Sequence, residues 1–208
     1  MDIKILLSNI AETTEAFDVS GLSLNTKTLT KGDLFIALQG EKSHGAEYID
    51  SAIENGCIAV LIEGRDVDCG VPTIRIDNLK PHLSGLAQNF YTKAKDVDLI
   101  AVTGTNGKTS VSHYISQLLD FLEVNNGVIG TLGISKVEKK SINTTPDIFS
   151  IYSSLEEYSS QGIKLAIIEA SSHALMQDRL EGLSFVQGIF TNLTQDHLDY
   201  HQTMGNYK

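Results

Sequence analysis

The stretch Asp98-Leu-Ile-Ala-Val-Thr-Gly-Thr-Asn-Gly-Lys-Thr-Ser110 decides how the middle of this chain folds. Residues 99–102 are a short apolar run of the kind that forms a buried strand. Gly104 and Gly107 then let the main chain turn tightly, because neither residue carries a Cβ atom. Beyond Lys108, apolar residues recur at helical spacing, at Val111, Ile115, Leu118, Leu119 and Leu122. The stretch therefore predicts a strand, a tight loop and a helix that begins near Lys108.

The predicted loop resembles the phosphate-binding P-loop. In that loop, backbone N–H groups surround the phosphates, a lysine reaches the β- and γ-phosphates, and a Ser or Thr hydroxyl binds Mg²⁺. The start of the helix adds free N–H groups and the positive end of its dipole. The strict spacing would place the first glycine at Val102, whereas this chain has it at Gly104. The simpler alternative is a strand-to-helix turn with an exposed lysine, but the flanking strand and helix favour phosphate binding.

Composition excludes several classes of function. The chain has 208 residues, of which 41% are hydrophobic, and its net charge is −10. An acidic protein of this kind is not expected to bind nucleic acid non-specifically. No apolar run approaches the length of a membrane helix and the first residues lack a signal-peptide pattern, so we expect a cytoplasmic protein without membrane insertion. The two cysteines, Cys57 and Cys69, are expected to be reduced thiols.

Two α/β domains are predicted. In the first, buried strands at 34–38, 58–62 and 72–76 alternate with helical patterns at 48–53 and 79–90. A short charged stretch at 92–96 then suggests a boundary. The predicted domains are residues 1–92 and residues 96–208, the second with a mostly parallel sheet.

The second predicted domain has an acidic residue, Glu169, at the end of a predicted strand. After a short strand at 127–130 and a hairpin-like region at 133–142, a helix is expected at 148–160, capped by Thr145 with Pro146 in its first turn. The next strand, 164–169, ends in Glu169, and another strand follows at 185–191. An acid at the carboxyl end of a strand beside a P-loop is where Mg²⁺ is held, although a strand-end acid can also simply face solvent.

Three motifs together resemble the Mur ligases, and the resemblance spans nearly all of the chain. They are Thr103-Gly-Thr-Asn-Gly-Lys-Thr109, Glu169-Ala-Ser-Ser-His173 with Gln177 and Arg179, and Thr191-Asn-Leu-Thr-Gln-Asp-His-Leu-Asp-Tyr-His201. The segment Gly32-Asp-Leu-Phe-Ile-Ala-Leu38 resembles the N-terminal UDP-binding domain of the same family. Within the family, the motifs are most similar to members that add the third residue of the peptidoglycan stem peptide.

The resemblance implies an ATP-dependent ligase of bacterial cell-wall synthesis that uses Mg²⁺. The γ-phosphoryl group of ATP would activate the carboxylate of UDP-N-acetylmuramoyl-L-alanyl-D-glutamate as an acyl phosphate. The amine of an amino acid, meso-diaminopimelate or L-lysine, would then attack it. The partners implied are these small molecules, without nucleic acid, and the protein is expected to be a monomer.

Site residues carried over from the family fall into three groups. Those expected to hold ATP are Gly104, Thr105, Asn106, Gly107, Lys108, Thr109 and Ser110. Those expected to act in catalysis or bind metal are Lys108, Thr109, Glu169 and His197. Those expected to contact the UDP-substrate are Leu24, Thr26, Glu41, Lys42, Ser43, Asn143, Thr144, Thr145, Ser171, Gln177 and Arg179. For the threonines the alternative role is capping, for Arg179 it is a surface charge, and for His197 it is packing within a loop.

The chain also departs from the family pattern. Asn25-Thr26-Lys27 stands where the family often has Asp-Ser-Arg, and His44-Gly45 stands where it often has Asp-Gly. Family members continue beyond this length into a domain for the incoming amino acid, so we expect an N-terminal part that does not ligate alone. Two alternatives remain open: a nucleotide- or UDP-sugar-binding module without ligase activity, and another ligase of the Mur and folylpolyglutamate synthetase superfamily.

Overall fold

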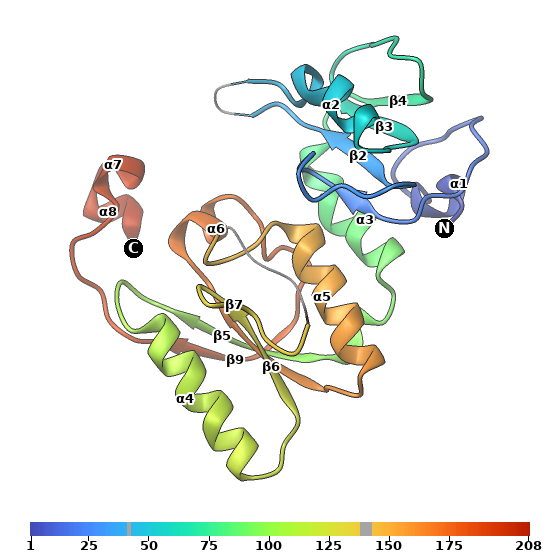
Figure 1. The fold of residues 1–208 in the computed structure, drawn as a ribbon. Helices are drawn as coiled ribbons and strands as arrows, with labels where there is room; N and C mark the ends of the chain where they lie inside the picture. Colours follow the sequence, from blue (N-terminus) through green and yellow to red (C-terminus); the bar gives the residue numbers. More distant parts are fainter. Residues whose placement is uncertain (41–42, 138–142) are drawn as a thin grey trace. The chain divides into compact units, whose positions relative to one another are not determined.

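The computed structural model describes residues 1–40, 43–137 and 143–208, and it divides into two compact units (Figure 1). Unit 1 comprises residues 1–92 and unit 2 comprises residues 93–208.

Unit 1 is built on a four-stranded sheet in which all neighbouring strands run parallel, in the order β1-β2-β3-β4. The strands are β1 (Leu22–Ser23), β2 (Leu34–Ala37), β3 (Ala59–Glu63) and β4 (Thr73–Ile76). The helices are α1 (Ile3–Leu6), α2 (Ile49–Glu54) and α3 (Leu83–Phe90), with short 3₁₀ turns η1 (Gly45–Tyr48) and η2 (Lys80–His82). The three strands predicted in this region are confirmed as β2, β3 and β4.

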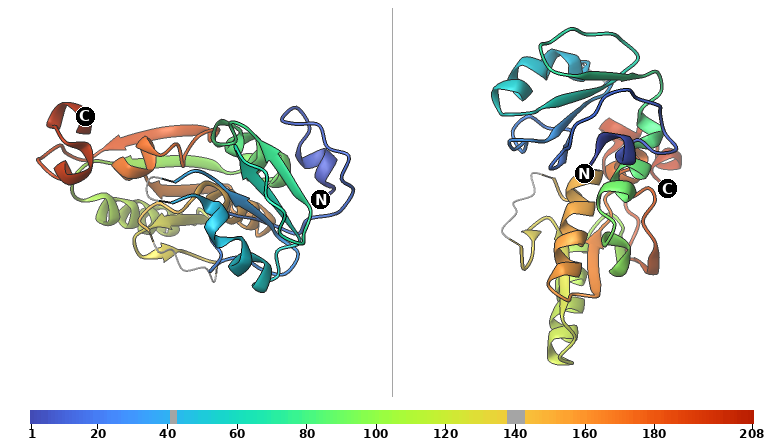
Figure 2. Two further views of the ribbon diagram at one scale, coloured as in Figure 1. Left: turned by 90° about the horizontal axis from the view of Figure 1, so that it is seen from above. Right: turned by 90° about the vertical axis from the view of Figure 1, so that its right-hand side faces the viewer.

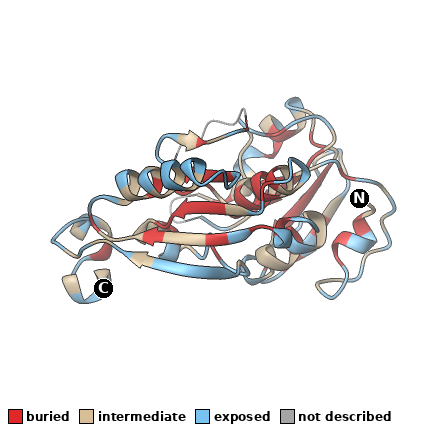
Figure 3. Ribbon diagram, turned by 90° about the horizontal axis from the view of Figure 1, so that it is seen from below, coloured by how far each residue is buried: buried red, intermediate tan, exposed pale blue. Residues whose placement is uncertain are grey.

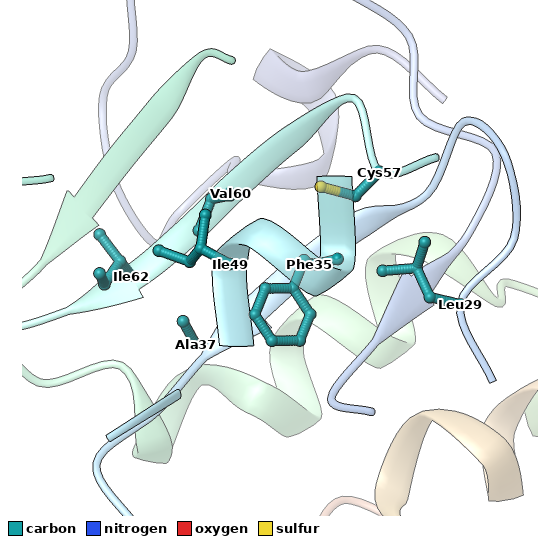
Figure 4. Close-up of a cluster of buried hydrophobic side chains, with 8 residues drawn as sticks. Leu29, Phe35, Ala37, Ile49, Cys57, Val60 and Ile62 are labelled. Atoms are coloured by element: carbon teal, nitrogen blue, oxygen red, sulfur yellow. The ribbon is translucent and has the colours of Figure 1, made fainter. Parts of the chain in front are cut away.

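The core of unit 1 explains why its strands are continuously apolar. On one face of the sheet, Phe35 and Val60 pack with Ile49 of α2 and with Cys57 (Figure 4). Residues that alternate with these along the strands, among them Leu34 and Leu61, are fully buried as well. Because successive side chains of a strand point to opposite faces, both faces of this sheet are covered, as expected for parallel strands.

Unit 2 contains a five-stranded sheet in the order β7-β6-β8-β5-β9. Every pairing in it is parallel except that of β7 with β6, which is antiparallel. The strands are β5 (Asp98–Thr103), β6 (Asn126–Gly130), β7 (Gly133–Ile134), β8 (Leu165–Glu169) and β9 (Phe185–Phe190). The helices are η3 (Ala94–Asp96), α4 (Lys108–Phe121), α5 (Ile148–Ser160), α6 (Ser172–Met176), α7 (Leu198–His201) and α8 (Met204–Tyr207). The predicted α/β class with a mostly parallel sheet is confirmed.

The helices α4 and α5 lie on opposite faces of the unit 2 sheet (Figures 1 and 2). Val128 of β6 packs with residues of α4, whereas a Cβ atom on its neighbour Gly127 would lie 2.4 Å from the ring of Tyr158 in α5. Burial and two carbonyl acceptors, Val128 O at 3.2 Å and Ser135 O at 2.8 Å, fix the Tyr158 hydroxyl. Burial raises the pKa of Tyr158 to about 12.

Two expectations about the start of α5 are wrong. The cap of α5 is Asp147, whose Oδ1 accepts the N–H groups of Phe149 and Ser150 at 3.1 Å each, and not Thr145. Pro146 therefore precedes the cap instead of opening the helix. The helix predicted to begin near Lys108 is confirmed as α4, although Leu118 in it and Leu122 just after it are 64% and 66% exposed.

Strand β9 forms one edge of the unit 2 sheet in the described part of the chain. It lies beside β5, and most of its residues are exposed (Figure 3). Phe185, Val186 and Phe190 are exposed by 36%, 58% and 63%, although the strand has the composition of a buried one. The short strand predicted at 127–130 is confirmed as β6. Of the hairpin-like region predicted at 133–142, β7 pairs antiparallel with β6, and residues 138–142 lie outside the described residues.

Candidate nucleotide-binding and substrate-binding site

The predicted phosphate loop lies between β5 and α4, at the carboxyl edge of the unit 2 sheet. Gly104 and Gly107 have φ angles of 126° and 89°, which residues with a Cβ atom rarely adopt. Gly104 is also confined by space, because a Cβ atom there would lie 2.2 Å from Oγ1 of Thr191 and 2.8 Å from the carbonyl oxygen of Asn192. Both glycines are therefore required by the backbone of this loop.

The loop is held by the segment that follows β9. The backbone N–H of Thr105 donates to Asn192 O at 2.9 Å, and its hydroxyl donates to Thr194 O at 3.1 Å. Asn106 N donates to the side chain of Asn192 at 3.1 Å, and that side chain returns a 2.8 Å bond to Asn106 O. These contacts fix the exposed tip of the loop, while Ser110 is exposed in the first turn of α4.

Lys108 is directed into the loop. Its Nζ donates to the carbonyl oxygens of Gly104 at 2.6 Å and Thr105 at 3.1 Å. Burial lowers the pKa of Lys108 from its ordinary value, whereas the carboxylates of Glu169 and Asp196 oppose this by favouring the charged form. A lysine ammonium group that lies within a backbone loop, next to the start of a helix, is suited to bind a phosphate group.

Glu169 is the second main feature of the site. It lies at the end of β8, in register with Val102 of β5, and is fully buried. Its Oε2 accepts a 2.8 Å hydrogen bond from the hydroxyl of Thr109, the second residue of α4. The prediction that the P-loop threonine and the strand-end acid converge is therefore correct in geometry, and the solvent-facing alternative for Glu169 is wrong.

The donor set at this point fits Mg²⁺. A carboxylate and a threonine hydroxyl are oxygen ligands, and Mg²⁺ in nucleotide sites takes one or two such protein ligands with phosphates and water. In the described residues, no group of three or more His, Cys, Asp or Glu side chains is arranged to hold a metal ion. A cation here would thus depend on phosphate oxygens as well as on Thr109 and Glu169.

His197 occupies the loop after β9 in a left-handed conformation, with φ 51°. Its Nε2 lies 3.8 Å from Oδ2 of Asp196, and its ring makes an edge contact with His173, the centroids being 5.0 Å apart. His173 also contacts Tyr200 and His201, at 4.2 Å and 5.6 Å. The structure therefore places His197 in a cluster of rings, and its role as a metal ligand stays a prediction.

Four of the residues predicted to contact the UDP-substrate in unit 2 come together. The hydroxyl of Thr145 donates to Glu169 O at 2.6 Å and lies 3.0 Å from Oγ of Ser171. Arg179 donates to Thr145 O at 2.7 Å and to Oε1 of Gln177 at 3.0 and 2.5 Å. Arg179 is thus tied to the site and is not a free surface charge. Nearby in the sequence, Asn143 is exposed and Thr144 is partly buried.

In unit 1, the predicted residues follow the carboxyl ends of two adjacent strands. Leu24 and Thr26 follow β1, and Ser43 follows β2, where its hydroxyl lies 3.3 Å from that of Tyr48. Because β1 and β2 are parallel, these residues share one edge of the sheet. Glu41 and Lys42 lie outside the described residues.

The departures in unit 1 retain local order. Oδ1 of Asn25 accepts the N–H of Lys27 at 3.0 Å, which is a turn that aspartate would also make. Nδ1 of His44 accepts the N–H of Ala46 at 2.9 Å and caps η1, while its Nε2 lies 3.1 Å from Glu63 O. Asn25 and His44 therefore each stabilise a local turn through a side-chain acceptor.

Sequence reasoning missed Thr131 and Glu63. Thr131 follows β6 and hydrogen-bonds both carboxylate oxygens of Glu169. Glu63 ends β3 and accepts backbone N–H groups from the loops after β2 and β4, at Gln39, Leu79 and Lys80. Their position in the sequence could have identified them, since both residues stand at the carboxyl end of a predicted parallel strand, where ligands bind.

Comparison with known families decides the relationship. Residues 102–208, just over half of the chain, match the Mur ligase middle domain. The chain belongs to the Mur ligase family. Residues 18–91 match a second Mur ligase segment, described as the catalytic domain of the family. The segment that matches the Mur ligase middle domain includes the phosphate loop, Thr131, Glu169 and His197.

Individual Mur ligases show the same relationship. The UDP-N-acetylmuramoyl-L-alanyl-D-glutamate–2,6-diaminopimelate ligase of Haemophilus influenzae (strain PittGG) is 38% identical over 212 residues, which cover 97% of this chain and 43% of the relative. A solved structure of a ligase of that name has a TM-score of 0.78 at 28% identity and covers 100% of this chain and 43% of the other. The chain therefore spans less than half the length of these relatives.

The fold extends to more distant members. The MurF ligase of Thermotoga maritima, solved in complex with ADP, has a TM-score of 0.58 at 21% identity, covering 91% of this chain and 41% of that one. At this identity the likeness is one of fold. Among the described residues of the present chain, no helix has the length and apolar character needed to cross a membrane.

Proposed function

We propose that this chain is the part of an ATP-dependent ligase that binds the nucleotide and the UDP-substrate. The ligase would add the third amino acid, meso-diaminopimelate or L-lysine, to UDP-N-acetylmuramoyl-L-alanyl-D-glutamate. Membership of the Mur ligase family and the identity to diaminopimelate ligases support this assignment. Because the chain spans 43% of such a relative, ligation is assigned to the whole protein and not to this chain alone.

The reaction has two steps. An oxygen of the substrate carboxylate attacks the γ-phosphorus of ATP, the bond to the β-phosphate oxygen breaks, and ADP leaves. The amine of the incoming amino acid then attacks the acyl carbon, an amide bond forms, a proton is lost from the nitrogen, and inorganic phosphate leaves. Such a reaction depends on positioning and on neutralising charge, which a phosphate loop provides.

Each element of the nucleotide site has a role in this proposal. The residues from Gly104 to Ser110 bind the phosphates through backbone N–H groups, and Lys108 lies against the β- and γ-phosphates. Thr109, Glu169 and His197 are the proposed protein ligands for Mg²⁺. Bound Mg²⁺ would neutralise charge on the phosphate oxygens as ADP leaves.

The substrate contacts are proposed from both units. In unit 2 they come from Asn143, Thr144, Thr145, Ser171, Gln177 and Arg179. In unit 1 they come from Leu24, Thr26, Glu41, Lys42 and Ser43. Arg179 is suited to bind a carboxylate or phosphate, since its planar guanidinium offers two parallel donors. Such a ligase would act as a monomer in the cytoplasm and serve cell-wall synthesis, and through it cell shape and division.

The single observation that carries the nucleotide assignment is the 2.8 Å hydrogen bond between Thr109 and Glu169 at the mouth of the glycine loop. Titration of the chain with ATP and Mg²⁺ tests it. We expect the wild-type chain to bind ATP, and Lys108→Ala to weaken binding at least about tenfold, as expected when a charged hydrogen bond to phosphate is lost. Lys164→Ala, which removes an exposed charge just before β8, serves as the control and should bind normally.

A second titration separates the substrate classes. The UDP-N-acetylmuramoyl dipeptide should bind the wild-type chain, whereas a folate should not. Binding of folate in preference to the UDP compound would favour a folylpolyglutamate synthetase relative. Absence of ATP binding by the wild-type chain would contradict the proposed nucleotide site.

A further inference from the structure

Thr131 makes two hydrogen bonds to one carboxylate. Its backbone N–H donates to Oε1 of Glu169 at 3.0 Å, and its hydroxyl donates to Oε2 at 2.9 Å. Glu169 is fully buried, whereas Thr131 is exposed. A buried carboxylate needs such partners, because an unpaired one is costly to bury.

The position of Thr131 follows from β6. This strand ends at Gly130, where a Cβ atom would lie 2.1 Å from Oε1 of Glu169. The missing side chain at Gly130 makes room for the carboxylate, and the next residue, Thr131, then meets it with both of its donors. Strands β6 and β8 are adjacent and parallel, so the contact joins the ends of two neighbouring strands.

Oε2 of Glu169 is shared between two hydroxyl groups. Thr109 donates to it from the first turn of α4 at 2.8 Å, and Thr131 donates at 2.9 Å from just beyond the neighbouring strand β6. In the proposed function, the Thr109 hydroxyl would also bind a cation through an oxygen lone pair, and it can keep donating its hydrogen to Glu169. Thr131 has no role at the phosphates in that proposal, and it can keep its two bonds to Glu169 throughout.

Thr131 also lies next to the segment proposed to contact the UDP-substrate. Its Oγ1 is 3.1 Å from Oγ1 of Thr144. The same hydroxyl therefore lies within hydrogen-bonding distance of both the acid of the nucleotide site and the segment proposed to contact the UDP-substrate.

We propose that Thr131 is a positioning residue, which holds the carboxylate of Glu169 in the orientation needed to bind the Mg²⁺ of Mg²⁺–ATP. This inference rests on the proposed function, and it adds a residue that the family resemblance did not supply. The hydroxyl is the decisive group, because the backbone donor would be present with any residue except proline.

The test compares ATP affinity with and without Mg²⁺, measured by calorimetry on the whole 208-residue chain. Thr131→Val keeps the shape and the backbone N–H but removes the hydroxyl, and Thr131→Ser restores the hydroxyl. In the wild-type chain, Mg²⁺ should tighten ATP binding. We expect Thr131→Val to reduce that gain about tenfold, the usual effect of losing one hydrogen bond to a charged group, with Thr131→Ser within about twofold of wild type. Affinity in the absence of Mg²⁺ should change little.

The control is Thr73→Val, the same substitution on a strand of unit 1, which should leave both affinities unchanged. A purely structural role for Thr131 predicts a different outcome, in which Thr131→Val lowers the melting temperature and weakens ATP binding equally with and without Mg²⁺. That outcome, or an unchanged Mg²⁺ effect in Thr131→Val, would overturn the inference and leave the proposed function standing. If the wild-type chain shows no Mg²⁺-dependent ATP binding, both are overturned.

Discussion

A Cβ atom at Gly130 would lie 2.1 Å from Oε1 of Glu169 and 2.6 Å from its Cδ. The end of β6 and the buried acid at the end of β8 therefore fit together only because residue 130 has no side chain. Non-bonded atoms do not approach this closely, so any larger residue at position 130 must displace the carboxylate or the strand.

We predict that Gly130→Ala destabilises the chain by about 1–3 kcal/mol, the usual cost of overpacking a core. The free energy of unfolding from urea titration measures this. Gly188→Ala is the matched control, because Gly188 lies in β9 of the same sheet and a Cβ atom there meets no described residue within 4 Å. Equal stability of the two variants would contradict the tight fit at Gly130.

Glu169→Gln should lower stability by about 1–3 kcal/mol. The neutral amide has one acceptor oxygen where the carboxylate has two, and the hydrogen bonds that Thr109 and Thr131 donate lose their charged acceptor. Thermal or urea unfolding gives the change. Glu181→Gln, an exposed change in the same unit, is the control and should stay within about 0.5 kcal/mol of wild type.

Tyr158→Phe should cost about 1 kcal/mol, because Ser135 O loses its 2.8 Å hydrogen bond from the hydroxyl. Tyr114→Phe is the control, since Tyr114 is 63% exposed on α4. A loss of stability in Tyr114→Phe as large as that in Tyr158→Phe would argue that the hydroxyl contacts are not the cause.

The same tyrosine predicts a dependence on alkaline pH. Its pKa is about 12 in the folded chain, whereas an exposed tyrosine ionises near 10. Between these values the folded state binds more protons than the unfolded state, so stability conferred by Tyr158 is full below about pH 10 and is lost as pH rises toward 12. Unfolding at a series of pH values, with Tyr158→Phe as the reference, should show a smaller alkaline loss in the variant.

Ser112→Ala should be neutral or stabilise the chain by up to about 1 kcal/mol. The Ser112 hydroxyl is buried in α4 and has no hydrogen-bond partner among the residues that the structure describes, and alanine has the higher helix propensity. Ser154→Ala in α5 is the contrasting variant, since that buried hydroxyl donates to Ser150 O at 2.7 Å. If both substitutions changed the unfolding free energy alike, the difference in hydrogen bonding would not explain stability here.

The central strand, loop and helix could be predicted from sequence because three local signals agree there: an apolar run, glycines at the turn, and helical spacing. The cap of α5 could not. Thr145 and Asp147 are both good capping residues. The Thr145 hydroxyl instead donates to Glu169 O, 24 positions away, and this tertiary hydrogen bond leaves Asp147 as the cap.

Other features could not be predicted from local sequence because they also depend on tertiary contacts. Thr131 carries no motif, and its role appears only once β6 and β8 are adjacent. The spacing of apolar residues in α4 correctly predicts a helix, but it does not tell how much of the helix a sheet will cover, and Leu118 lies outside the covered part. In unit 1, the capping by His44 depends on one ring nitrogen, and the substituted sequence Asn25-Thr26-Lys27 still forms its turn.

The outer strand β9 has a practical consequence for anyone who prepares this chain. Its exposed aromatic and branched residues lie along a sheet border whose backbone groups are able to pair with another molecule, which is how β-rich aggregates begin. Aggregation should therefore increase with concentration, and Val186→Lys is expected to reduce it without altering the nucleotide loop.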